Sequence, residues 1–298
     1  MSGESPKAIF YALAANFGIA VCKYAAAAFT GSGSMFAEAI HSTADCGNQL
    51  LLLFGLRQSR EPPTPLHPMG TGRAINFYSL LVALLLFFVG GAFSVYEGVH
   101  RLIAREPLRF VYVALVVLGI SVVLEAFSLY GAMREIRKGA PTQSLWRWAR
   151  ETRDSDLLVV AGEDIAALAG LAIAFAAVLL TVITGNPVWD ACGSIGVGIL
   201  LMLIAWFIAR EVKSMIVGES ASPEMRRDIE SFLRARPEIR SLITLQWGKE
   251  VMVAVQCEML EYDHSRTMVE AINEIEADLQ ARFPLVRWVF FEPDFVNR

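Results

Sequence analysis

The chain has 298 residues, of which 55% are hydrophobic and only 19% are charged, and its formal net charge is −4. A soluble domain is about 45–50% apolar and about 25% charged, so this composition argues against an ordinary soluble protein. The small negative charge and the lack of a basic arm give no sign of a nucleic-acid partner. Four widely separated cysteines give no sign of a disulfide framework or a thiolate zinc site.

The apolar residues gather in six blocks of about 20 residues or more, which is long enough to cross a hydrocarbon core of about 30 Å. We expect a membrane-spanning helix in each block, and therefore an all-α transmembrane domain of six helices. The first block follows a short tail without a small-residue cleavage site, so we expect a retained span and not a removed signal peptide. The six predicted spans cover residues 8–30, 34–57, 75–99, 110–133, 156–183 and 188–210.

Basic residues in the connections predict the orientation in the membrane. The connection between spans two and three and the connection between spans four and five are rich in arginine, whereas the first and fifth connections have no lysine or arginine. The third connection goes against this trend, with Arg101, Arg105 and Arg109. On balance, the excess of positive charge on the cytoplasmic side predicts that both termini are cytoplasmic. We expect a multi-pass protein of the bacterial inner (cell) membrane.

The composition changes at about residue 219, where an amphipathic helical pattern opens with Ser222-Pro223-Glu224. Two alternating apolar runs, a second helical pattern and a final strand follow. The order α-β-β-α-β predicts a small cytoplasmic α+β domain of the ferredoxin-like kind, with both helices on one face of the sheet. We expect a transport domain over 1–214 and this regulatory domain over 219–298. A core of about 80 residues is small, so we expect dimerisation.

The second span carries polar residues at helical spacing, namely Ser34, Glu38, His41, Asp45 and Asn48. Separations of four, three, four and three residues place them in one stripe on one face of the helix. An ionisable residue in a membrane span costs at least about 2.5–3.5 kcal/mol, so such residues are functional candidates. The stripe could instead face a water-filled vestibule or a polar interface between helices.

His41 and Asp45 project onto the same spot because they are four residues apart. One imidazole nitrogen and one carboxylate oxygen supply half of a tetrahedral site for zinc or a similar first-row ion. The fifth span offers Glu163 and Asp164 for the other half. Adjacent helical positions point about 100° apart, so these two acids cannot reach one ion equally well. A stripe of small residues on the same helix allows another helix to come close, and consists of Gly162, Ala166, Gly170 and Ala174.

Other charges at membrane level predict structural roles. Lys23 in the first span is expected to pair with a carboxylate of the second span. Glu97, Glu125 and Asp190 are expected to be ion-pair partners, helix caps or interfacial groups more often than metal ligands.

Several segments together resemble a known family. They are HSTADCGNQLLLLFGLRQS from residue 41, the Pro-rich loop ending in HPMGTGR, GGAFSVYEG from residue 90, GED at 162–164 and the NPxxD pattern at 186–190. The chain resembles the cation diffusion facilitators, and in particular the subgroup that includes a mitochondrial zinc transporter. The resemblance implies a homodimeric exporter that exchanges a divalent cation, Zn²⁺ above all, for H⁺ across the lipid bilayer, without a resident cofactor.

The resemblance also implies a transport site on spans two and five, with His41, Asp45 and Asp164 as metal ligands. Zinc exporters of the family have a further His or Asp ligand where this chain has Val160. The missing ligand is then Glu163, Asn48, a water molecule or nothing. Metal ligands lose protons when the ion binds, and an imidazole titrates near neutral pH, so His41 is the expected exchanging group.

Three alternatives remain beside the zinc exporter. The same transporter could prefer Fe²⁺, Mn²⁺ or Co²⁺, and a membrane-anchored metal sensor could use the C-terminal domain as its output. An intramembrane metal enzyme is disfavoured because the sequence has no HExxH or GxSxG motif. We therefore expect a transporter and not an enzyme.

Overall fold

The computed structural model describes residues 6–104, 110–139, 141–236, 238–259 and 264–294, and of these the side chains from residue 17 onward, apart from that of residue 111. Arg105 and Arg109 of the third connection lie outside these residues. The chain divides into two compact units. The helical unit is drawn from Met1–Leu56, Phe77–Gln143 and Asp156–Val212, and the sheet unit from Arg57–Asn76, Ser144–Ser155 and Lys213–Arg298. The division into domains 1–214 and 219–298 stays a prediction.

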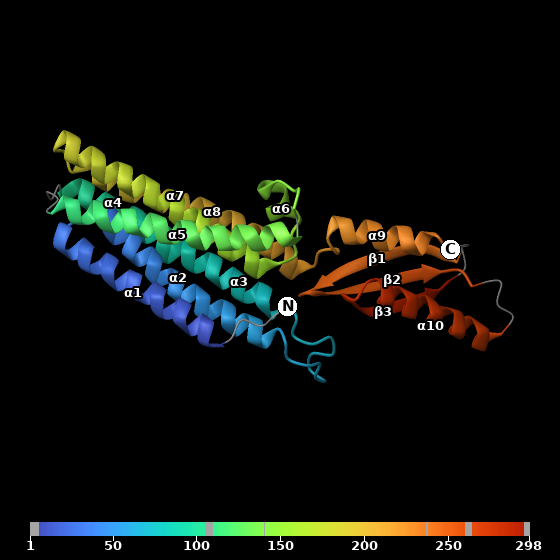
Figure 1. Ribbon diagram of the computed structural model, residues 1–298. Coiled ribbons are helices and arrows are strands. Elements are labelled where there is room, and N and C mark those ends of the chain that lie inside the picture. The colour runs from blue at the N-terminus through green and yellow to red at the C-terminus, as the bar shows by residue number, and fades with distance from the viewer. Residues whose placement is uncertain (1–5, 105–109, 140, 237, 260–263, 295–298) are drawn as a thin grey trace. The chain divides into compact units, whose positions relative to one another are not determined.

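Long helices make up the helical unit and run alongside one another (Figure 1). Each predicted span corresponds to one helical path, and the third, fourth and sixth paths run past the predicted ends at 99, 133 and 210 to Ala104, Gly139 and Val217. The paths are α1 (Pro6–Thr30), α2 (Gly33–Gln58), the succession α3 (Ala74–Leu85), η1 (Leu86–Ala92) and α4 (Phe93–Ala104), then α5 (Val111–Gly139), α7 (Ser155–Thr184) and α8 (Val188–Val217).

Four helical segments in the described part of the chain are long and apolar enough to cross a membrane. They are Ala74–Ala104, Tyr112–Gly139, Ser155–Thr184 and Val188–Val217. Over its described side chains, α1 contributes a shorter apolar segment, Phe17–Thr30. Helix α2 is 26 residues long but less apolar, because it carries the polar stripe. By length and composition, these apolar helices are those expected of an integral, multi-pass membrane protein.

The third helical path contains a π-helical segment, η1, which the apolar pattern of the sequence does not predict. Its two glycines are buried, and a Cβ on Gly91 would lie only 3.0 Å from the carbonyl oxygen of Gly198 on α8. Because neither Gly91 nor Gly198 has a side chain, the backbones of η1 and α8 pack directly against each other. Ser94, in the first turn of α4, donates a hydrogen bond of 2.5 Å to the carbonyl of Gly90 in η1. π-Helical turns of this kind are frequent at functional sites.

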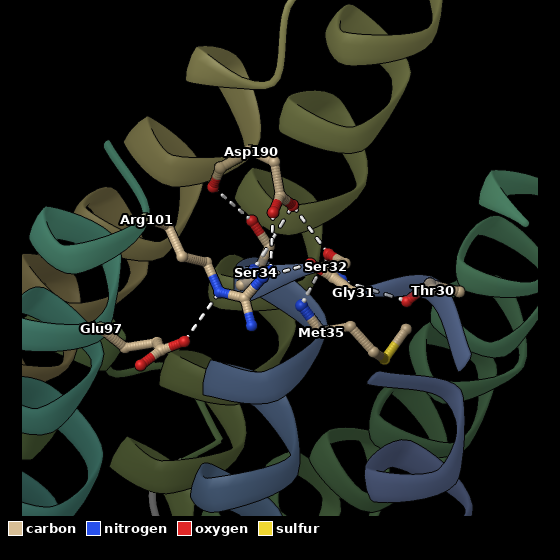
Figure 2. Close-up of polar contacts among 9 residues, drawn as sticks. Thr30, Gly31, Ser32, Ser34, Met35, Glu97, Arg101 and Asp190 are labelled. Atoms are coloured by element: carbon tan, nitrogen blue, oxygen red, sulfur yellow. Dashed lines mark hydrogen bonds and ion pairs between the residues drawn. The ribbon is translucent and has the colours of Figure 1, made fainter. Parts of the chain in front are cut away.

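The first turn of α2 is capped by a carboxylate from another helix (Figure 2). Asp190, in the first turn of α8, accepts hydrogen bonds from the Gly33 amide at 2.6 Å and, more weakly, from the Ser34 amide at 3.4 Å. Its Oδ1 also accepts from the Ser32 hydroxyl at 2.7 Å. The Met35 amide donates to the Ser32 hydroxyl oxygen and the Phe36 amide to the Ser32 carbonyl. All four initial amides of α2 are thus satisfied, as a membrane interior requires.

The neighbouring turn between α1 and α2 is held by a second helix. Arg101 of α4 donates to the carbonyl of Gly31, whose φ of 70° ends α1, and pairs with Glu97 at 2.7 Å. Asp190 is therefore a helix cap and Glu97 an ion-pair partner, as expected. The unexpected finding is that Asp190 caps α2 and ties it to α8.

Replacing Asp190 by alanine should lower the stability of the protein. Two backbone amides and one hydroxyl would lose their acceptor, and each buried unsatisfied donor costs about 1–3 kcal/mol. We expect Asp190→Ala to lower the midpoint of thermal unfolding in detergent by several degrees, and Asp228→Ala, which removes an exposed carboxylate from α9, to leave it unchanged. Equal midpoints for the two variants would contradict this role.

The sheet unit has the predicted α-β-β-α-β order, with α9 (Pro223–Arg234), β1 (Ile239–Trp247), β2 (Glu250–Cys257), α10 (Ser265–Arg282) and β3 (Val286–Pro293). Strand β2 is central, antiparallel to β1 and parallel to β3. Alternate residues of β2 join one buried cluster with residues of both helices, so the helices share one face of the sheet.

Cys257 belongs to this cluster, and burial raises the pKa of its thiol, which suits a packing residue and not a reactive one.

The connection 57–76 and a short helix, α6 (Leu145–Glu151), also belong to the sheet unit. Their sequences predict only polar connections between spans. Arg73 stacks its guanidinium 4.2 Å from the centre of the Trp247 ring and donates to the Gln246 carbonyl at 3.2 Å. Arg153 pairs with Glu219 at 2.7 Å. These arginines therefore have defined structural partners in addition to their predicted effect on orientation.

Candidate functional site

The polar stripe of α2 faces the interior of the helical unit. Ser34, Glu38 and Asn48 are fully buried, His41 is 1% exposed, and the Asp45 side chain is 18% exposed. The burial follows from the helical spacing, because five polar residues on one face turn away from lipid together.

His41 and Asp45 lie one turn apart and point toward each other, with 3.7 Å between Nδ1 of His41 and Oδ1 of Asp45. Neither ring nitrogen of His41 has a hydrogen-bond partner among the described residues, and the same holds for Oδ1 of Asp45. Buried polar atoms are nearly always hydrogen-bonded, so an unpartnered set of this kind calls for an explanation. A nitrogen and an oxygen with free lone pairs can take up a proton or a metal ion.

The two adjacent acids of α7 reach different helices, as their spacing predicts. Glu163 turns toward α2, where its Oε1 accepts a 2.5 Å hydrogen bond from Nδ2 of Asn48. Asp164 turns toward α5, where its Oδ1 accepts from the Ser128 hydroxyl at 3.0 Å, and its Oδ2 has no partner in the described part of the chain. Ser128 was not predicted as a site residue, because a lone serine in a span carries little signal.

The acids of α2 and α7 nevertheless share one electrostatic environment. Glu163 interacts electrostatically with Asp45 and Asp164, and Asp164 interacts with Asp45. Among the described residues, no three His, Cys, Asp or Glu side chains come close enough to hold a metal ion together. The ligand set His41, Asp45 and Asp164, with Glu163 or Asn48 as a further ligand, therefore stays a prediction.

Small residues of α7 let its neighbours come close. A Cβ on Gly162 would lie 2.6 Å from the Ile208 side chain of α8, and a Cβ on Gly170 would lie 3.0 Å from Oε1 of Glu38 on α2. The helix with Glu163 and Asp164 is therefore in close contact with the helix that carries the polar stripe.

Lys23 of α1 is fully buried and pairs with Glu38 of α2 at 3.3 Å, and it also donates to the Ser42 hydroxyl at 2.7 Å. The pairing expected for this lysine is confirmed. Lys23 therefore places a positive charge next to the acids of the stripe.

The contact between Asn48 and Glu163 predicts the effect of a new charge. Asn48→Asp places a second carboxylate against Glu163 inside the helical unit, and an uncompensated buried charge costs about 3–5 kcal/mol. Asn48→Ala leaves one hydrogen bond unmade, at about 1–3 kcal/mol. At pH 8 in detergent, we expect Asn48→Asp to unfold at a lower temperature than Asn48→Ala. A higher unfolding temperature for Asn48→Asp than for Asn48→Ala would show that the side chains at positions 48 and 163 are not in contact in solution.

Comparisons with known proteins bear on this arrangement. A family model described as the cation efflux transmembrane domain matches residues 9–217. The human proton-coupled zinc antiporter SLC30A9, a mitochondrial protein, is 36% identical over 222 residues, which cover 74% of this chain and 39% of the antiporter. Metal tolerance protein C4 of Arabidopsis thaliana is 34% identical over 245 residues, or 80% of this chain and 53% of that protein. The cation-efflux pump FieF of Klebsiella pneumoniae is 26% identical over 263 residues, or 86% and 81%.

This chain spans about two fifths of the length of the human antiporter and about half of the plant protein. The family model and two of these relatives are named for cation efflux or antiport, which supports the prediction of a transporter and not an enzyme. The family match over residues 9–217, together with identities above 30% over most of the chain, shows that this protein belongs to the cation efflux family, as its resemblance to the cation diffusion facilitators implied.

Proposed function

We propose that this protein exports a divalent metal cation, with Zn²⁺ as the main substrate, in exchange for protons. The observation that carries this proposal is the set of buried, unpartnered atoms on His41, Asp45 and Asp164, within helices of a cation efflux protein. Apolar surroundings disfavour such atoms unless a captured cation or proton uses them. Glu163 and Asn48 lie beside this set and are the further candidate ligands.

Proton exchange follows from the chemistry of the donors. Carboxylates and an imidazole bind a metal ion only in their deprotonated forms, so an arriving ion displaces protons and returning protons displace the ion. An imidazole titrates near neutral pH, at about 6.5 when unperturbed, so His41 is the proposed exchanging group. One of the relatives is named a proton-coupled zinc antiporter, which supports this coupling.

The donor types support zinc without requiring it. Imidazole nitrogen suits zinc and other first-row metals, and carboxylate oxygens complete such sites. The position of the additional family ligand holds Val160, which cannot bind a metal, so Glu163 or Asn48 would have to take its place. The same arrangement could carry Fe²⁺, Mn²⁺ or Co²⁺, and flux measurements with each metal distinguish these substrates.

We propose six membrane spans, with α1 and α2 joining the four apolar segments. An even number of spans places both termini on one side of the membrane, which the basic connections predict to be the cytoplasmic side. The membrane itself is proposed to be a bacterial inner membrane. A bacterial pump is among the relatives, whereas the human antiporter is named as mitochondrial.

We also propose that the protein works as a homodimer joined through the sheet unit. The face of the sheet away from the helices carries apolar residues in register, with Ile243 of β1, Ala254 of β2 and Phe290 of β3 side by side. Ile243 is 69% exposed and Phe290 54% exposed. An apolar patch of this kind is typical of an interface with another protein.

Removing one proposed ligand should stop transport. In liposomes loaded with a zinc-sensitive dye, we expect Asp45→Asn and Asp164→Asn each to reduce Zn²⁺ flux at least about tenfold, because a neutral amide is a much poorer ligand for a divalent ion. Asp228→Asn, on exposed α9, is the matched control and should transport normally. Normal flux in both site variants would refute the proposed site.

A charge on the uncovered sheet face should break the dimer. We expect Ile243→Glu to shift the detergent-solubilised protein from dimer to monomer in light scattering, because a carboxylate cannot be buried there without a partner. Ser231→Glu, on the exposed side of α9, should stay dimeric. A dimer in both variants would place the interface elsewhere.

A further inference from the structure

A lysine inside the helical unit sits beside the proposed transport site without being one of its ligands. Lys23 has no exposed surface, and its ammonium group contacts Oε2 of Glu38 at 3.3 Å and the Ser42 hydroxyl at 2.7 Å. Both partners lie on α2, within three residues of His41. A buried lysine is costly in a membrane span, so its position calls for a reason beyond helix packing.

Glu38 has the properties of a metal ligand whose carboxylate is already paired with another cation. It belongs to the same stripe as His41 and Asp45, it is fully buried, and its Oε1 has no hydrogen-bond partner in the described part of the chain. Gly170 on α7 leaves room beside that oxygen, because a Cβ there would come within 3.0 Å of it. A cation at His41 could therefore reach a further carboxylate by moving one turn along α2. The ammonium group of Lys23 already pairs with the other oxygen of this carboxylate, Oε2 of Glu38.

The charge of Lys23 also acts on the site directly. Lys23 interacts electrostatically with both His41 and Asp45. Charges several ångströms apart in a low-dielectric interior interact strongly, so a fixed ammonium lowers the affinity of this region for any cation. A transporter needs such a limit, because a site with too many unopposed carboxylates would not release its ion.

We propose that Lys23 is a tethered countercharge that keeps Glu38 from binding the transported ion and sets the affinity of the site low enough for release. This inference rests on the proposed function. The ordinary alternative is an ion pair that only fastens α1 to α2. The countercharge and the ordinary ion pair predict different Zn²⁺ affinities when the charges of Lys23 and Glu38 are removed singly or together.

The test measures equilibrium binding of Zn²⁺ alone to the full chain in detergent by titration calorimetry. We expect Lys23→Met to bind Zn²⁺ at least about tenfold more tightly, because Glu38 becomes free and the repulsion disappears. Glu38→Gln, which leaves Lys23 without its counterion, should bind at least about tenfold more weakly. The double variant and Lys23→Arg should both stay within about threefold of the unaltered protein, because their local charge balance is preserved.

Transport supplies a second readout. In liposomes, Lys23→Met should lower both KM and kcat for Zn²⁺, since an ion held more tightly leaves more slowly. Lys138→Met is the matched control, because it removes an exposed lysine that pairs with Glu135 on α5. It should change neither quantity.

The outcomes separate the two proposals. Unchanged affinity in folded Lys23→Met, or affinity shifts of the same sign in Lys23→Met and Glu38→Gln, would overturn the countercharge while leaving the transport site intact. If Lys23→Met does not fold, the other two single variants still test the countercharge. It would be overturned if Glu38→Gln bound Zn²⁺ as well as the unaltered protein. It would also be overturned if Lys23→Arg bound Zn²⁺ less well than the unaltered protein. A protein that binds no Zn²⁺ in any form would overturn the proposed function as well.

Discussion

The structure of the helical unit depends on one constraint, that polar groups within an apolar slab must find partners inside the protein. The constraint explains why α2 begins at a carboxylate supplied by α8, because the free amides of a helix start cannot be left to lipid. It also explains why Lys23 lies against Glu38 and why Asn48 lies against Glu163. Each pair joins two helices, so these polar residues fasten the unit together.

The same constraint makes the exceptions informative. His41 and one oxygen each of Asp45 and Asp164 lack hydrogen-bond partners among the described residues, although these residues lie in membrane-length helices. They come from the two helices that the stripe and the acid pair singled out. The helices approach closely because Gly170 of α7 has no side chain to hold α2 away from it. The proposed transport site rests on this combination of close helices and unsatisfied polar atoms, which is rare in a protein interior.

The sequence was sufficient for the features that repeat along the chain. Apolar blocks of membrane length predicted the helical paths, and the three-and-four spacing of Ser34 through Asn48 predicted their common burial. It was insufficient where partners come from distant segments. Nothing local indicated that Asp190 would cap α2 or that Ser128 would meet Asp164, because such contacts depend on how helices pack. The π-helical turn of η1 and the short helix α6 were missed because neither changes the apolar pattern that defines a span.

The close fit between the connection 57–76 and the β1–β2 hairpin has a consequence for protein engineering. The backbones of Gly72 and Gly248 leave no room for a side chain between them, and Arg73 covers the indole of Trp247. Gly72 and Gly248 are far apart in the chain, yet the two segments that carry them pack directly against each other. A chimaera that receives its C-terminal portion from a relative would therefore have to receive the matching segment between α2 and α3 from the same donor, or the graft would meet a foreign loop at its hairpin.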